Sequence, residues 1–215
     1  MLSLRTKRDL STIRSYSSKT ASVTKRVEEV YLPIFVDLIP TLLGGMANEL
    51  DNETEVIHDR VPLNRVPALT EKEYYVRGCT ALLDAVGGAI HHIGNVHKYA
   101  RKEDRPEKTL FVITTDGLEN ASRRYTYDKV KAMIERQRET YGWEFLFLGA
   151  NIDAAREAAR FGIRADCAAD YHADSIGTEA VYASVCEAVC QVRRSAPLAA
   201  DWKQRIDADF KGRKR

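Results

Sequence analysis

The fold of this chain is decided by one stretch, TLFVITTDG at residues 109–117. A short run of apolar and β-branched residues is typical of a strand buried on both faces of a sheet. Asp116 and Gly117 then form a turn signal at its carboxyl end. Ligands of open α/β sheets bind outside the carboxyl ends of the strands, so Asp116 is a candidate ligand for a hard cation. The alternative is an aspartate that only satisfies backbone donors in the turn.

Strand and helix patterns alternate around this stretch. Further strands are predicted at 54–58, 143–149 and 166–171, and helices after Thr80, from Thr126 to Gly142, at 154–162 and at 178–193. This alternation predicts an α/β fold, a three-layer sandwich with a doubly wound, mostly parallel sheet. Gly87 and Gly88, inside the first helix, indicate close packing against the sheet. Two prolines in the apolar stretch 30–43 argue against a central strand there.

The composition excludes several classes of protein. No apolar run approaches the length of a membrane span, and a net charge of +2 gives no argument for nucleic acid. The four cysteines include no Cys-x-x-Cys pair, which argues against a zinc site. We therefore expect free thiols in a reducing, cytoplasmic setting. The alternative location is an organelle, because the Ser/Thr-rich, acid-poor start is similar to a transit peptide. Phosphate-binding loops, nucleophile elbows and dinucleotide fingerprints are absent, so we predict that the chain is not an enzyme.

Three blocks of sequence resemble bacterial and phage-type proteins with a von Willebrand factor type A (VWA) domain. The blocks are RGCTALLDA at 77–85, ITTDGLENAS at 113–122 and WEFLFLGAN at 143–151. The resemblance covers roughly residues 51–190. It implies a doubly wound α/β sheet with a metal-ion-dependent adhesion site at its carboxyl edge, where Mg²⁺ takes a carboxylate from a partner protein.

The family's metal site takes ligands from three loops, and two of them have a counterpart here. Thr80 matches the threonine of the second loop, and Asp116 matches the aspartate of the third. The Asp-x-Ser-x-Ser motif of the first loop is absent, and its nearest echoes are IRSYS at 13–17 and DLIPT at 37–41. Because Mg²⁺ demands octahedral oxygen ligation, two ligands imply weak or absent binding. Thr80 as a helix N-cap is the alternative.

The resemblance also implies a surface for a protein ligand that presents a carboxylate. This surface would comprise the loops 74–80, 116–125 and 149–153. Tyr and Arg are favoured at binding hot spots, so the candidate partner contacts are Tyr74, Tyr75, Arg77, Arg123, Arg124 and Tyr125. The alternative for Tyr74 and Tyr75 is packing within the loop. Glu119 and Asn120 are expected to order the loop after Asp116, and Asp84 either to support it or to face solvent.

We divide the chain into a divergent basic N-terminal segment at 1–50, a VWA-like domain at 51–195 and a basic C-terminal tail at 196–215. The leading hypothesis is a non-enzymatic protein-interaction module with a degenerate metal site. The second is a Mg²⁺-dependent hydrolase or phosphotransferase on a similar sheet, with Asp116 as its acid. The third is a nucleic-acid-associated factor that uses the basic ends, whose binding would fall steeply with salt.

Overall fold

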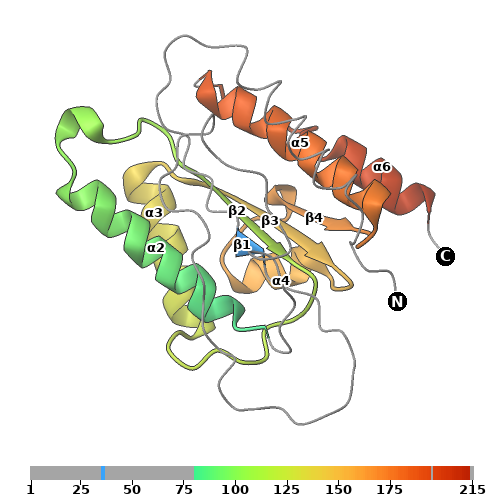
Figure 1. Ribbon diagram of the computed structural model, residues 1–215, viewed down its shortest axis with the longest axis horizontal. Coiled ribbons are helices and arrows are strands. Elements are labelled where there is room, and N and C mark those ends of the chain that lie inside the picture. Colours follow the sequence, from blue (N-terminus) through green and yellow to red (C-terminus); the bar gives the residue numbers. More distant parts are fainter. Residues whose placement is uncertain (1–34, 37–79, 195, 214–215) are drawn as a thin grey trace, which may run out of the picture.

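The computed structural model describes residues 35–36, 80–194 and 196–213 (Figure 1). Within them, one parallel sheet has the strand order β1-β2-β3-β4. Its strands are β1 (Phe35–Val36), β2 (Leu110–Thr115), β3 (Glu144–Ala150) and β4 (Ala168–Tyr171). The helices are α2 (Leu82–Tyr99), α3 (Tyr127–Tyr141), α4 (Ala154–Arg160), α5 (Ser175–Arg193) and α6 (Gln204–Gly212). The predicted α/β class and parallel sheet are confirmed, while the strand predicted at 54–58 lies outside the described residues.

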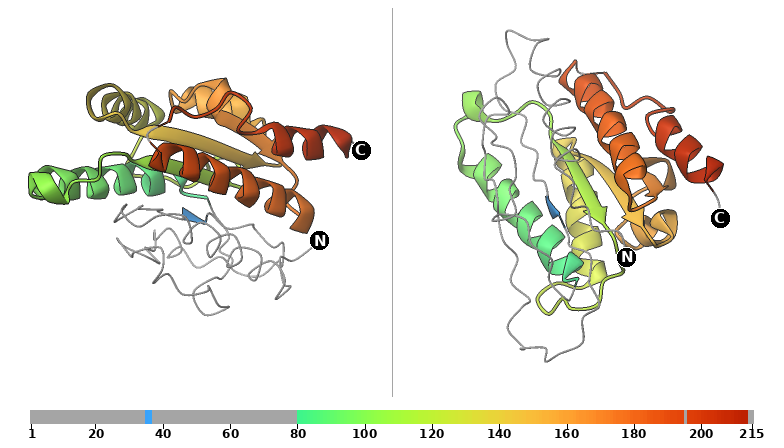
Figure 2. Two further views of the ribbon diagram at one scale, coloured as in Figure 1. Left: turned by 90° about the horizontal axis from the view of Figure 1, so that it is seen from above. Right: turned by 45° about the vertical axis from the view of Figure 1, so that its right-hand side comes forward.

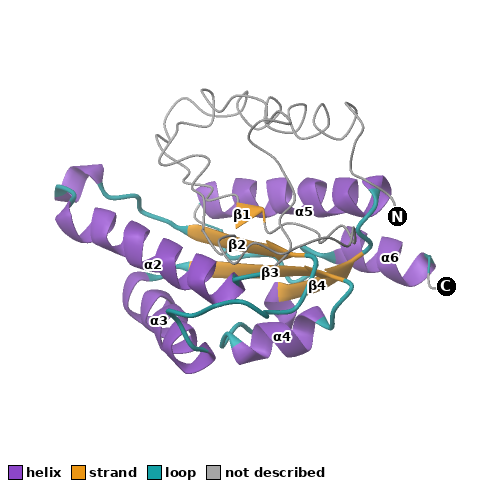
Figure 3. Cartoon of the chain, turned by 60° about the horizontal axis from the view of Figure 1, so that its bottom comes forward, coloured by secondary structure: helices purple, strands orange, loops and turns teal. Residues whose placement is uncertain are grey.

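Both faces of the sheet are covered by helices (Figure 3). One face packs against α2, α3 and α4 through Phe111, Ile113, Phe145 and Phe147. The other face packs against α5 and α6 through Leu110, Val112, Leu146 and Leu148. Successive side chains of a strand point to opposite faces, so burial on both sides explains why β2 and β3 are continuous apolar runs. The described strands follow chain order without a reversal, so they do not themselves display the doubly wound arrangement.

The helix boundaries follow local capping signals. Thr126 is the N-cap of α3, and its hydroxyl accepts a hydrogen bond from the backbone N–H of Lys129 at 3.4 Å. Gly142 ends the same helix in the left-handed conformation, with φ of 66°. Both ends were predicted from the sequence. Among the described helices, none is long and apolar enough to cross a membrane.

The structure corrects the interpretation of Gly87 and Gly88, and it shows a short strand in the apolar stretch 30–43. A Cβ on Gly87 would lie 2.5 Å from the ring of Tyr125, whereas one on Gly88 would meet nothing within 4 Å. Gly87 therefore makes room for a loop side chain and not for the sheet. Phe35–Val36 forms a strand between Pro33 and Pro40, and Val36 pairs with Thr114 of β2. This two-residue strand lies at the edge of the described sheet, so it agrees with the argument against a central strand at 30–43.

The C-terminal residues 196–215 were expected to form a basic tail, and the structure corrects this. They contain α6, which lies alongside α5 (Figure 2). Trp202 and Ile206 are buried in the core on this face of the sheet. The ring of Phe210 lies 4.8 Å from that of His172. Apolar side chains four residues apart therefore form a packed stripe within an otherwise charged segment.

Candidate functional site

The loop between β2 and α3 passes the start of α2 at the carboxyl edge of the sheet (Figure 1). The backbone N–H of Thr80 donates to Oδ1 of Asn120 at 2.9 Å, and the N–H of Asn120 donates to the carbonyl of Thr80 at 3.1 Å. The buried Thr80 hydroxyl lies 3.7 Å from the position that a Cβ on Gly117 would take. The two segments carrying Thr80 and Asp116 therefore meet, although they are far apart in the sequence.

Glu119 provides the cap that α2 lacks locally. The N-cap residue of α2 is Ala81, which offers no side-chain hydrogen bond. Instead, Oε2 of Glu119 accepts from the backbone N–H of Leu83 at 2.8 Å, and Oγ of Ser122 accepts from that of Asp84 at 2.9 Å. A carboxylate near a helix N-terminus also interacts favourably with the helix dipole. The cap of α2 thus comes from the loop and not from Thr80, which answers the alternative role considered for that residue.

The carboxylate of Glu119 also orders its own loop. Its Oε1 accepts from the backbone N–H groups of Ala121 at 2.9 Å and Ser122 at 2.7 Å. Its Oε2 accepts from the Ser122 hydroxyl at 2.8 Å. Together with the Thr80–Asn120 pair, these bonds agree with the ordering role expected for Glu119 and Asn120. Ser122 was not foreseen, because nothing in its local sequence indicates that it contacts α2.

Asp84 holds the part of the loop that precedes α3, at residues 123–125. Its carboxylate, which is only 6 % exposed, accepts hydrogen bonds of 2.9 Å from the backbone N–H groups of Arg123, Arg124 and Tyr125. Burial by itself raises the pKa of Asp84. The three backbone donors and the nearby Arg124 guanidinium outweigh it and hold this pKa below its usual value. Of the two roles considered for Asp84, support of the loop is therefore the one observed.

Asp116 lies directly after β2 and contacts the residue directly after β3. The side-chain amide of Asn151 donates to Oδ1 of Asp116. Burial raises the pKa of Asp116, and the hydrogen bond from Asn151 opposes that rise without cancelling it. The adjoining turn is closed by Thr115, whose hydroxyl donates to the carbonyl of Gly117 at 2.8 Å. Asp116 thus takes part in a contact between strand ends, beyond any role in its own turn.

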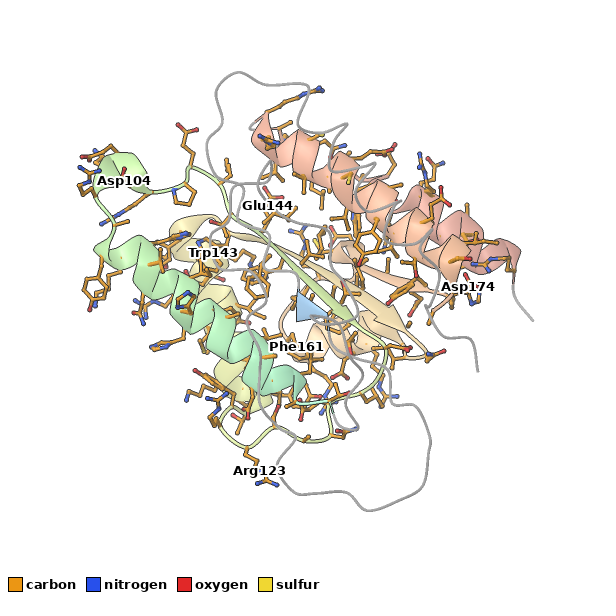
Figure 4. All side chains as sticks on the ribbon, in the orientation of Figure 1. Asp104, Arg123, Trp143, Glu144, Phe161 and Asp174 are labelled. Carbon is orange, nitrogen blue, oxygen red and sulfur yellow. The ribbon has the colours of Figure 1, made fainter. Side chains whose placement is uncertain are left out.

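The residues that were predicted to contact a partner differ in their exposure. Arg123 and Arg124 are exposed, and Figure 4 shows Arg123 pointing away from the body of the molecule. Tyr125 is half-buried, packs against Gly87 and has the ammonium of Lys129 4.4 Å from its ring centre. Its main role is therefore packing. Tyr74, Tyr75 and Arg77 lie outside the described residues.

The carboxyl edge of the sheet offers only two candidate ligands for a hard cation. Thr80 offers a hydroxyl and Asp116 a carboxylate, which are oxygen ligands of the kind that Mg²⁺ prefers. Within 80–194 and 196–213, no three or more His, Cys, Asp or Glu side chains gather as a metal-binding group. Two sequences partly match the missing Asp-x-Ser-x-Ser motif. Of these, DLIPT at 37–41 directly follows a strand, because β1 pairs with β2 and ends at Val36. Those residues themselves lie outside the described part.

Comparison of the chain with models of known protein families, with curated proteins and with solved structures found no match.

Proposed function

We propose that this chain is a non-enzymatic protein-interaction module of the VWA kind, built on a three-layer, doubly wound sandwich with a degenerate metal-ion-dependent adhesion site. The observation that carries the proposal is the meeting of the Thr80 and Asp116 segments at the carboxyl edge. The resemblance of the same two segments to VWA-domain sequences supports the proposal. A structural loop with no ligand would explain the hydrogen bonds, but it would not require a hydroxyl and a carboxylate on the two segments that meet.

Each residue of this edge has a distinct task in the proposal. Thr80 and Asp116 would hold Mg²⁺ weakly, with water as the remaining ligands. The bound cation would supply an open position for a carboxylate of the partner. Arg123 and Arg124 are exposed on a backbone that Asp84 holds, so they would attract an acidic partner to the same edge. A partner that presents a carboxylate fits both features.

The metal alone provides the first test. Calorimetric titration of MgCl₂ and MnCl₂ should give weak binding to the wild-type chain and none to Asp116→Ala or Thr80→Val. Asp104→Ala is a matched control, because Asp104 lies on an exposed 3₁₀ turn at the other end of the molecule (Figure 4). It should bind as the wild type does. Absence of heat with the wild-type chain, or equal heat with Asp116→Ala, would overturn the proposal.

Two further assays separate this proposal from the other hypotheses. Turnover of p-nitrophenyl phosphate that is lost in Asp116→Ala would establish the hydrolase instead. Binding of an oligonucleotide that falls steeply with salt would establish the nucleic-acid factor. We also propose a cytoplasmic location, which the free thiols of the described cysteines, Cys167, Cys186 and Cys190, support.

A further inference from the structure

Asn151 has a distinctive backbone conformation. Its φ of 58° lies in the left-handed region, and no other non-glycine residue in the described part of the chain has a positive φ. Asparagine enters this region more easily than most residues because its short polar side chain bonds locally. Such conformations persist where the surroundings enforce them, and they cluster at functional sites. The contacts around Asn151 therefore show what holds this conformation.

The turn that carries Asn151 is held on both sides. A Cβ on Gly149 would lie 2.7 Å from Cγ1 of Ile152 and 2.9 Å from Cβ of Ala154, so the chain folds back closely over the end of β3. Downstream, the N–H of Ala154 donates to Oδ1 of Asp170 at 2.7 Å. These contacts hold the backbone of 149–154 and with it the direction of the Cα–Cβ bond of Asn151.

That side chain connects the ends of two neighbouring strands. Thr115 and Gly149 are paired in the sheet, so the loops that follow them emerge side by side. Asn151, in the loop after β3, donates through Nδ2 to Oδ1 of Asp116, in the loop after β2. A carboxylate at the end of a strand is otherwise able to rotate about its Cα–Cβ bond. The amide selects one orientation.

We propose that Asn151 is a positioning residue, which holds the Asp116 carboxylate in the orientation that meets a divalent cation. This inference rests on the proposed function for the cation, but the orienting contact itself does not. The cap that Glu119 and Ser122 give to α2, and the bonds that Asp84 accepts from the loop, involve other atoms, so the role of Asn151 is separate from both.

Two variants test the role of Asn151 without disturbing the turn, because glycine and aspartate both tolerate the left-handed conformation. Asn151→Gly removes the amide, and Asn151→Asp replaces the donor with a second carboxylate. Asn95→Asp is the matched control, since it makes the same amide-to-carboxylate change on α2. Three-bond NMR couplings to Cγ of Asp116 report its rotamer in the metal-free protein, and Mn²⁺ titration reports cation affinity.

The wild-type chain and Asn95→Asp should show a single Asp116 rotamer, whereas Asn151→Gly should show averaged couplings. Mn²⁺ affinity should fall about fivefold in Asn151→Gly, the equivalent of one ordinary hydrogen bond. It should rise in Asn151→Asp, because a carboxylate adds a ligand. Unchanged couplings in Asn151→Gly would overturn the inference. Absence of Mn²⁺ binding in every variant would instead overturn the proposed function, while the couplings would still decide the role of Asn151.

Discussion

Replacement of Asp84 by asparagine should destabilise the protein substantially, although it changes only one atom of the side chain and the charge. In the native structure, Oδ1 of Asp84 accepts from the N–H groups of Arg124 and Tyr125, and Oδ2 accepts from that of Arg123. An asparagine offers one acceptor oxygen and one NH₂ group. At least one backbone N–H would then face another donor.

The expected magnitude follows from these contacts. A hydrogen bond to a charged group contributes roughly 1.5–3 kcal/mol, and a neutral one roughly 0.5–1.5 kcal/mol. Losing one charged bond and converting two others to neutral ones should lower the free energy of unfolding by about 5 kcal/mol, taken at the middle of these ranges. For a domain of this size, each kcal/mol corresponds to roughly 2–4 °C in Tm, so the shift should be about 10–20 °C.

The pH dependence of this loss has a definite sign. The pKa of Asp84 is lower in the folded protein than its usual value, so its contribution is present above about pH 4, the unfolded pKa. It is lost as the pH falls through the folded pKa, where the carboxylate becomes protonated. The difference in stability between the wild type and Asp84→Asn should therefore be full at pH 7 and shrink in acid.

Urea denaturation followed by circular dichroism measures this difference, with Asp104→Asn as the matched control. Asp104 is 49 % exposed and pairs with Arg101 on the surface, so its replacement should change stability by less than about 0.5 kcal/mol. A loss in Asp84→Asn as small as that of the control would show that the carboxylate does not stabilise the loop. A difference that grows as the pH falls would contradict the lowered pKa of Asp84.

Other substitutions probe the packing around the site. Gly87→Ala should lower the free energy of unfolding by about 1–3 kcal/mol, because the new Cβ collides with the Tyr125 ring. Gly88→Ala has open space and should raise it by about 0.5–1 kcal/mol through better helix propensity. Equal effects of the two substitutions in denaturation would contradict the contact between Gly87 and Tyr125. Trp202→Ala should cost about 3–5 kcal/mol, because this side chain is buried in the same core cluster as Ile206 of α6. A Tm within 2 °C of the wild type, roughly the equivalent of 1 kcal/mol or less, would show that Trp202 is not packed in this core.

The central strands could be predicted because their signal is local. The runs at 109–115 and 143–149 lie within one residue of β2 and β3 at each end. Buried strands are bounded by changes in hydrophobicity that a single sequence displays. Thr126 and Gly142 were equally accessible, since capping depends on residues beside the helix end.

The cap of α2 could not be predicted, because it comes from residues 36 to 38 positions away in the sequence. Glu119 and Ser122 have no local spacing that relates them to Leu83. The helix α6 was missed for another reason. Its charge suggested a tail, although Trp202, Ile206 and Phe210 recur every four residues and could have indicated an amphipathic helix.

We propose above that Thr80 and Asp116 form one cation-binding edge. Paramagnetic broadening of backbone amide signals by Mn²⁺ tests it most directly, because the effect depends steeply on distance from the ion. Substoichiometric Mn²⁺ should selectively broaden the amides of Thr80, Asp116, Gly117 and Asn151, and Mg²⁺ in excess should restore them. Uniform broadening, or broadening centred on other acidic residues such as Asp104, would contradict the claim.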